Sequence, residues 1–108
     1  MSRFKFKAWD KKNNLLIRPG QIQLVKGELA MPDCVLLQFT GFTDMMGQEI
    51  YEEDILLIGE VKHRAYWDEN ELTWMYKKGS AIKRLNQKFT ETTVRGYNAY
   101  ERNETEVD

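Results

Sequence analysis

The chain has 108 residues, 42% of them hydrophobic and 31% charged, and its formal net charge is −1. That length fits one domain, and the composition is typical of a folded globular protein, which excludes a disordered chain. The near-neutral charge argues against a protein that binds nucleic acid through bulk charge. We expect a single domain over residues 1–108, with a polar tail at about 102–108 that frays.

Nothing in the sequence predicts contact with a membrane. The longest apolar run covers Ile55–Ile58, whereas a bilayer-spanning helix needs about 20 residues. Residues 1–7 hold no apolar signal core. We therefore expect a cytoplasmic protein.

Alternation of apolar and polar residues predicts the strands of the N-terminal half. Residues 3–9 alternate basic and apolar side chains, and a turn-rich stretch leads into 15–17, so this pair is predicted to form a hairpin. A short strand at 21–25 and a longer one at 35–40 follow. Residues 55–58 are apolar throughout, which is typical of a strand buried on both faces.

Two strands within residues 61–76 form the clearest predicted hairpin. We predict that Trp67 pairs with Leu72 across a four-residue loop. That register places Ala65 opposite Trp74, a large side chain against a small one. Because both tryptophans lie on apolar faces, we expect both to be largely buried.

Helical spacing occurs only near residues 80–89. Ser80 is placed to cap this helix, and its apolar stripe consists of Ile82, Leu85 and Phe89. A final strand is predicted at 92–95. With about six or seven short strands, the predicted fold class is mainly β: a small antiparallel barrel or a strongly curled sheet, with one short helix.

Cysteine and histidine each occur once. A single Cys34 excludes an internal disulfide and a cysteine-based metal site, and a single His63 excludes a two-histidine metal site. We expect Cys34 to act as a small hydrophobe at the start of a buried strand. We expect His63 to be partly buried and hydrogen-bonded, since no nucleophile is visibly paired with it. No cofactor and no metal ion are predicted.

Charge is distributed unevenly along the chain. Residues 1–26 hold seven basic side chains and one acid, and residues 27–60 hold eight acids and no Lys or Arg. Residues 61–95 hold eight basic side chains and four acids. Such blocks either pair across strands or leave one acidic and one basic face.

The densest acidic cluster consists of Glu49, Glu52, Glu53 and Asp54. Four carboxylates could hold Mg²⁺ or Ca²⁺, or provide acid/base pairs for hydrolysis. Strand alternation sends neighbouring side chains to opposite faces, however, and the spacing of an EF-hand is absent. We therefore predict a solvated acidic rim or a docking surface for a basic partner, rather than a metal site.

The main basic patch consists of Lys77, Lys78, Lys83, Arg84 and Lys88. Because aromatic residues lie close by in the sequence, this patch could bind phosphates and stack bases. The alternative is that the cations only solvate a short helix while the aromatic residues belong to the core. The Gly-Ser at 79–80 lacks the pattern of a phosphate loop.

Three segments resemble the YopX family of small proteins from phages and prophages. Gln38–Asp44 (QFTGFTD) and Gly47–Ile55 (GQEIYEEDI) resemble its central signature, Phe4–Asp10 its N-terminal strand, and Val94–Glu101 its closing segment. The resemblance implies a β-rich domain that is encoded by a phage or an integrated prophage. It implies no activity and no catalytic residues.

The signature residues are suited to shaping turns. Gly41 and Gly47 bracket a chain reversal, across which Asp44 can accept a backbone N–H group, and Asp54 can do the same for its own loop. The chain departs from the family at Glu53, where the resemblance implies glycine. If that residue has a positive φ, Glu53 costs about 1 kcal/mol.

Three functions are compatible with these features. The expected one is a non-catalytic module that binds a host or phage protein, because charge is segregated and no catalytic constellation is visible. A homo-oligomer is also compatible with such a module. The second is a nucleic-acid-binding domain that uses the patch at 77–88, and the third is an enzyme with a carboxylate site.

Overall fold

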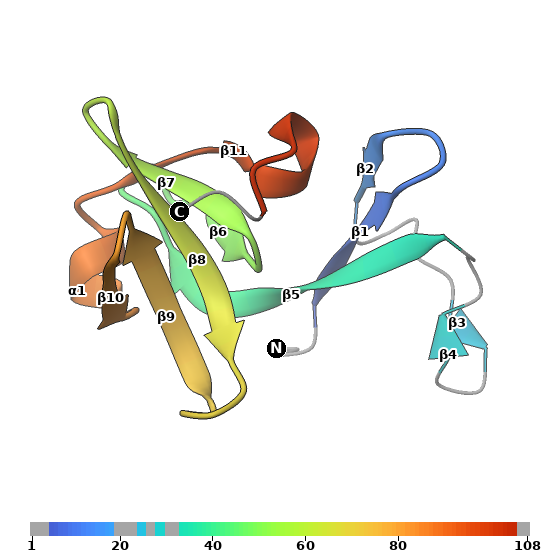
Figure 1. Cartoon of the computed structure of the whole chain (residues 1–108), viewed down its shortest axis with the longest axis horizontal. Coiled ribbons are helices and arrows are strands. Elements are labelled where there is room, and N and C mark those ends of the chain that lie inside the picture. The colour runs from blue at the N-terminus through green and yellow to red at the C-terminus, as the bar shows by residue number, and fades with distance from the viewer. Residues whose placement is uncertain (1–4, 19–23, 26–27, 30–32, 106–108) are drawn as a thin grey trace.

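The computed structural model describes residues 5–18, 24–25, 28–29 and 33–105. In this part of the chain the strands are β1 (Phe6–Asp10), β2 (Leu15–Ile17), β3 (Leu24–Val25), β4 (Glu28–Leu29), β5 (Cys34–Thr43), β6 (Glu49–Tyr51), β7 (Asp54–Ile58), β8 (Val61–Asp68), β9 (Thr73–Lys78), β10 (Ala81–Arg84) and β11 (Val94–Asn98). One helical turn, α1 (Gln87–Thr90), precedes β11, and a 3₁₀ turn, η2 (Ala99–Arg102), follows it (Figure 1).

The first sheet has the antiparallel order β2-β1-β5-β6. Strand β5 serves two partners, because Cys34–Gln38 pairs with β1 and Phe39–Thr43 pairs with β6. Pairing with β6 is irregular, and Gly41 within it has a φ of 90°, a conformation open to glycine at little cost. Figure 1 shows β1, β2 and the first half of β5 projecting from the rest of the molecule. We call these three segments the β1–β2 arm.

The second sheet has the antiparallel order β10-β9-β8-β7-β11. Strands β7 to β10 follow one another as consecutive hairpins. Strand β11 then returns to the free edge of β7, with a register shift between Arg95 and Tyr97. Strands β3 and β4 form a separate two-stranded sheet.

The main core lies where the two sheets and α1 meet. It contains the buried side chains of Ile50, Leu56, Ala65 and Leu85, with four partly buried residues packed around them. Two of those, Tyr76 and Phe89, stack with their ring centroids 3.9 Å apart. This stack fixes α1 against β9.

His63 belongs to the same core. It is buried, its Nδ1 atom lies 3.2 Å from the carbonyl oxygen of Leu56, and its ring meets Tyr76 and Phe89 edge-on. The prediction of a buried, hydrogen-bonded histidine is confirmed. Cys34 begins β5, as predicted, and is half-buried.

The predicted fold class, mainly β with a curled sheet, is confirmed. The strand count is not, because the described residues form eleven strands, several of only two or three residues. The helix predicted from Ser80 is also wrong at its start. Gly79 has a φ of 56° and opens a two-residue turn into β10, so the helix begins only at Gln87, capped by the Asn86 side chain.

The β8–β9 hairpin has a different register from the predicted one. Trp67 pairs with Trp74 and Ala65 pairs with Tyr76. The chain turns later than expected because the Asp68 carboxylate accepts the backbone N–H groups of Asn70 and Glu71. Trp67 is 37% exposed and Trp74 is half-buried, so neither is as buried as predicted, although Trp74 packs against the core and meets the Trp67 ring edge-on.

The tail predicted to fray from residue 102 is held in place at Glu104. Its backbone N–H donates to the carbonyl of Ala99, and its carboxylate binds Lys62 at 3.0 Å and the Tyr97 hydroxyl. Residues 106–108 of that tail lie outside the described residues. Among the described residues, no helix has the length and apolar character required to cross a membrane.

Candidate functional site

The acidic cluster does not form one surface, because its carboxylates differ in their partners and in their burial. Glu49 pairs with Lys5 at 2.6 Å, and Glu53 pairs with Arg64 at 2.8 Å. Glu52 lies half-buried, and burial raises its pKa above the usual value. Within the described residues no group of three or more His, Cys, Asp or Glu is arranged to hold a metal ion.

Asp54, the fourth acid, is fully buried and is the centre of a polar network. Its carboxylate accepts the backbone N–H of Tyr51 at 2.7 Å, two N–H groups of Arg95 at 3.0 and 3.2 Å, and the amide of Asn98 at 3.0 Å. Asp44 likewise accepts three backbone N–H groups, one of them from Arg95. Both aspartates therefore bind main-chain donors as predicted, and Asp54 is not part of a docking surface.

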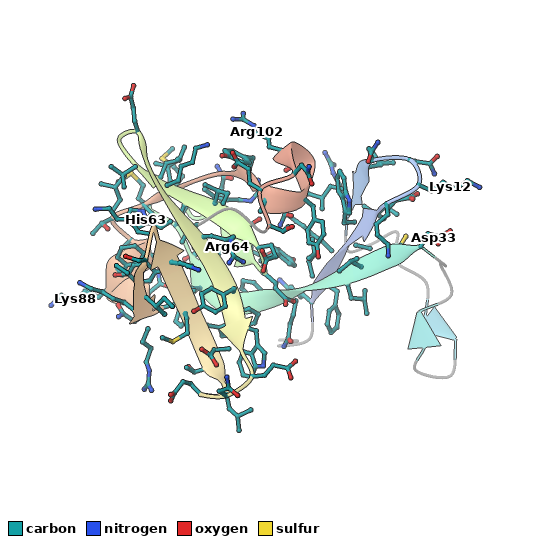
Figure 2. All side chains as sticks on the ribbon, viewed as in Figure 1. Lys12, Asp33, His63, Arg64, Lys88 and Arg102 are labelled. Carbon is teal, nitrogen blue, oxygen red and sulfur yellow. The ribbon has the colours of Figure 1, made fainter. Side chains whose placement is uncertain are left out.

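The basic patch is divided between the two faces of the β9–β10 hairpin. Lys83 lies opposite Tyr76, on the face that α1 covers, whereas Lys77 lies opposite Ile82 and Arg64 on the other face. By alternation, Lys78 shares the first face and Arg84 the second. Lys88 is on α1 and lies at the edge of the molecule in Figure 2. The five cations therefore do not make one continuous surface.

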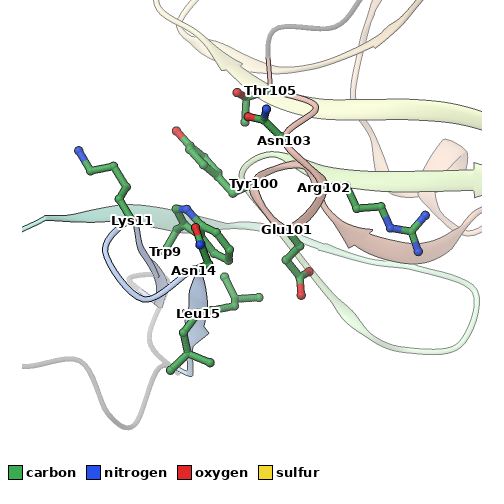
Figure 3. A pocket seen from close by; sticks show the side chains of 10 residues that line it. Trp9, Lys11, Asn14, Leu15, Tyr100, Glu101, Arg102, Asn103 and Thr105 are labelled. Carbon is green, nitrogen blue, oxygen red and sulfur yellow. The ribbon is translucent and has the colours of Figure 1, made fainter.

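A groove lies between the β1–β2 arm and η2, with a volume of about 670 Å³. Side chains from the arm face those of η2 and the residues after it (Figure 3). The lining consists of Trp9, Lys11, Asn14, Leu15 and Leu16 from the arm and Tyr100, Glu101, Arg102, Asn103 and Thr105 from the other side. We call it the Trp9–Tyr100 groove.

The two aromatic rings form the joint between the arm and the rest of the molecule. Trp9 is buried, and its ring lies 6.1 Å from that of Tyr100 at an interplanar angle of 28°. Burial raises the pKa of Tyr100, and the carboxylates of Glu53 and Glu52 raise it further. Leu16 is the cross-strand partner of Trp9 and shares its face of the hairpin, whereas Leu15, which is 57% exposed, pairs with Asp10 on the opposite face.

Local capping explains how Tyr100 reaches this place. The Asn98 side chain accepts the N–H of Tyr100 at 3.1 Å, and the Glu101 carboxylate accepts the N–H of Asn98 at 2.8 Å. This reciprocal capping box starts η2 directly after β11. Sequence reasoning missed the groove because its two halves are some ninety residues apart in the chain.

The comparisons with known proteins agree with this architecture. The family described as YopX protein matches residues 20–107. Among solved structures, the crystal structure of protein EF1440 from Enterococcus faecalis is similar with a TM-score of 0.69 and 18% sequence identity, over 94% of this chain and 96% of that chain. At such identity the likeness shows a shared fold. No curated protein sequence matches significantly. Since the family match covers most of its residues, the chain belongs to the YopX family.

Proposed function

We propose that this domain is a non-catalytic interaction module that binds a segment of a host or phage protein in the Trp9–Tyr100 groove. The observation that carries the proposal is the groove beside the stacked rings of Trp9 and Tyr100, with Leu16 on the same face of the hairpin as Trp9. Aromatic floors that are rimmed by polar groups are typical of protein–protein contact surfaces. The phage or prophage origin that the resemblance implies makes a host or phage protein the expected partner.

The rest of the lining is suited to binding a peptide chain. Asn14 and Asn103 supply amide donors and acceptors at the rim, where each has a positive φ, 52° and 56°. The lining holds two cations, Lys11 and Arg102, and one carboxylate, Glu101, so the rim favours a partner segment of neutral to acidic character. The groove lining holds no Ser, Cys or His, which supports binding rather than nucleophilic catalysis.

The test is an affinity capture from host cells, with and without nuclease, using the full chain and two matched variants. Lys11→Glu reverses a charge in the groove lining, and Lys12→Glu makes the same change at the next residue of the same turn, outside that lining. Both side chains are exposed, so both variants should fold. We expect a protein partner that survives nuclease, is captured less with Lys11→Glu, and is retained with Lys12→Glu.

A purified partner then gives the magnitude. We expect Lys11→Glu to raise the dissociation constant by about threefold or more, since an attractive charge at the rim becomes a repulsive one for a neutral to acidic segment. Equal binding by all three proteins would contradict the proposed groove. If capture disappears on nuclease treatment, the result would instead support the hypothesis that the basic side chains bind nucleic acid.

A further inference from the structure

A second, smaller pocket lies farther along β1 from the groove. Its volume is about 330 Å³, and it is lined by Lys7, Arg18, Gln48, Glu49, Tyr51 and Arg95. The lining brings together three cations from three separate parts of the chain: β1, the residue after β2, and β11. Only one carboxylate accompanies them.

Lys7 is the unusual member of this set. Its ammonium lies 4.6 Å above the centre of the Tyr51 ring, in a half-buried position. Burial lowers the pKa of Lys7, and the positive charge of Arg95 lowers it further. A cation that is partly desolvated beside a second cation is costly unless an anion compensates it.

The nearby carboxylates are already occupied. Glu49 accepts a hydrogen bond from Lys5 at 2.6 Å and one from the Tyr51 hydroxyl at 3.2 Å. Asp54 accepts the hydrogen bonds of the polar network described above, and two of these come from Arg95. Among the described residues, neither Lys7 nor Arg18 pairs with a carboxylate. Asp54, Glu101 and Glu49 act on Lys7 only from a distance, so neither cation has a carboxylate in direct contact among these residues.

We propose that this pocket binds the dianion of a phosphate monoester. Lys7 and Arg18 supply the two charges that such a group balances. Arg95 uses two of its five N–H groups on Asp54, and its Nη2 lies 3.9 Å from a carboxylate oxygen of Glu101, which leaves other N–H groups for an oxygen in the pocket. Gln48 adds an amide to the lining.

Charge and size favour phosphate over a carboxylate. A single carboxylate would neutralise only one of the two free cations, whereas a phosphate monoester carries close to two negative charges at neutral pH. The pocket also exceeds the space that one phosphate needs, so it accommodates part of the molecule that bears it. The site is independent of the Trp9–Tyr100 groove and does not rest on the proposed interaction function.

The test is a titration of the full chain at constant ionic strength, in which binding is monitored through the amide chemical shifts of the protein in solution. The probes are inorganic phosphate, O-phosphoserine and adenosine monophosphate, with acetate as a monoanionic control. We expect saturable shifts with the phosphate probes at a dissociation constant of about 1 mM or tighter. Equal affinity for all three means that the phosphate alone is recognised, whereas a preference identifies which source fits the pocket.

Two lysines close together in the chain provide the matched variants. Lys7→Gln should weaken phosphate binding at least tenfold, whereas Lys12→Gln, which changes an exposed lysine of the turn after β1 that does not line the pocket, should change it less than twofold. Lys7→Gln should remain folded, because it removes a desolvated charge. Arg18→Gln, at an exposed position, should weaken binding in the same way.

Two outcomes would overturn the proposal. One is the absence of saturation with every phosphate probe up to about 20 mM, well above the expected dissociation constant. The other is equal weakening by Lys12→Gln and Lys7→Gln, which would indicate diffuse attraction to a basic region rather than a site. As a separate check, phosphate should raise the melting temperature of the wild type and leave that of Lys7→Gln unchanged.

Discussion

Replacing Glu53 with glycine tests why this chain has a non-glycine residue at a position where the backbone is left-handed. Glu53 has a φ of 69°, a conformation that costs a non-glycine residue about 1 kcal/mol. Its carboxylate accepts two hydrogen bonds from Nη1 of Arg64, at 2.8 and 3.1 Å. The two side chains are only 15% and 17% exposed. We infer that the ion pair offsets the strain of the turn.

The structure predicts the size and the sign of the change. Glycine relieves about 1 kcal/mol of strain but leaves Arg64 without its carboxylate. Losing one partner of a buried pair costs about 3–5 kcal/mol, and partial exposure reduces this to roughly 2–3 kcal/mol. The Glu53→Gly variant should therefore be less stable than the wild type by about 1–2 kcal/mol.

The sign should reverse when Arg64 is first replaced by methionine. Burial raises the pKa of Glu53 even with Arg64 beside it, so without Arg64 its carboxylate is an uncompensated, desolvated charge. Removing it then relieves both the charge and the strain. In that background we expect Glu53→Gly to stabilise the domain by about 1 kcal/mol or more.

Urea unfolding followed by tryptophan fluorescence measures all four proteins of this cycle. Glu53→Ala is the matched control, because it removes the ion pair but keeps the strained φ, and it should be about 1 kcal/mol less stable than Glu53→Gly. The reasoning fails if Glu53→Gly stabilises the wild type, or if the change has the same sign in both backgrounds.

Three further predictions concern the polar network and the core. Asp54→Asn should lower the free energy of unfolding by about 3–5 kcal/mol, because it leaves Arg95 facing a neutral amide in a buried site; a loss below 1 kcal/mol in urea unfolding would contradict this. Trp74→Ala should cost about 3 kcal/mol, since Trp74 packs on the core, and a melting temperature within a degree of wild type would show a surface role. Burial raises the pKa of Tyr51 from 10.0 to about 12, so the folded state keeps a proton that the unfolded chain loses. Stability should therefore fall as pH rises from about 10 to about 12, and Tyr51→Phe should remove that part of the decline.

Local patterns predicted the elements that depend on neighbours in the chain. The alternation around β1, β5 and β7 located those strands, and the two aspartates of the signature were recognised as acceptors for main-chain N–H groups. The register of β8 and β9 was predicted wrongly by two residues. The reason is that the Asp68 carboxylate accepts two N–H groups of the loop. The alternation of apolar and polar residues does not predict these hydrogen bonds.

The candidate sites were harder to predict than the strands. A cluster of acids in sequence became separate ion pairs and one buried carboxylate, because their cationic partners come from β1, β8 and β11. The basic patch was divided by the alternation of β9 and β10. Both pockets are formed by residues from opposite ends of the chain, and a single sequence carries no signal for that proximity.

The return of β11 to the free edge of β7 determines when a newly made chain can close. Arg95 donates hydrogen bonds to both Asp44 and Asp54, and it follows them in the chain by 51 and 41 residues. At about 5–20 residues per second, a ribosome takes roughly 2–8 s to extend the chain from Asp54 to Arg95. During that interval the hairpins from β7 to β10 can form locally, while both carboxylates remain hydrated and one edge of β7 stays unpaired. The domain is therefore completed by its last strand, and a chain that stopped before Val94 would keep its hairpins with that edge open.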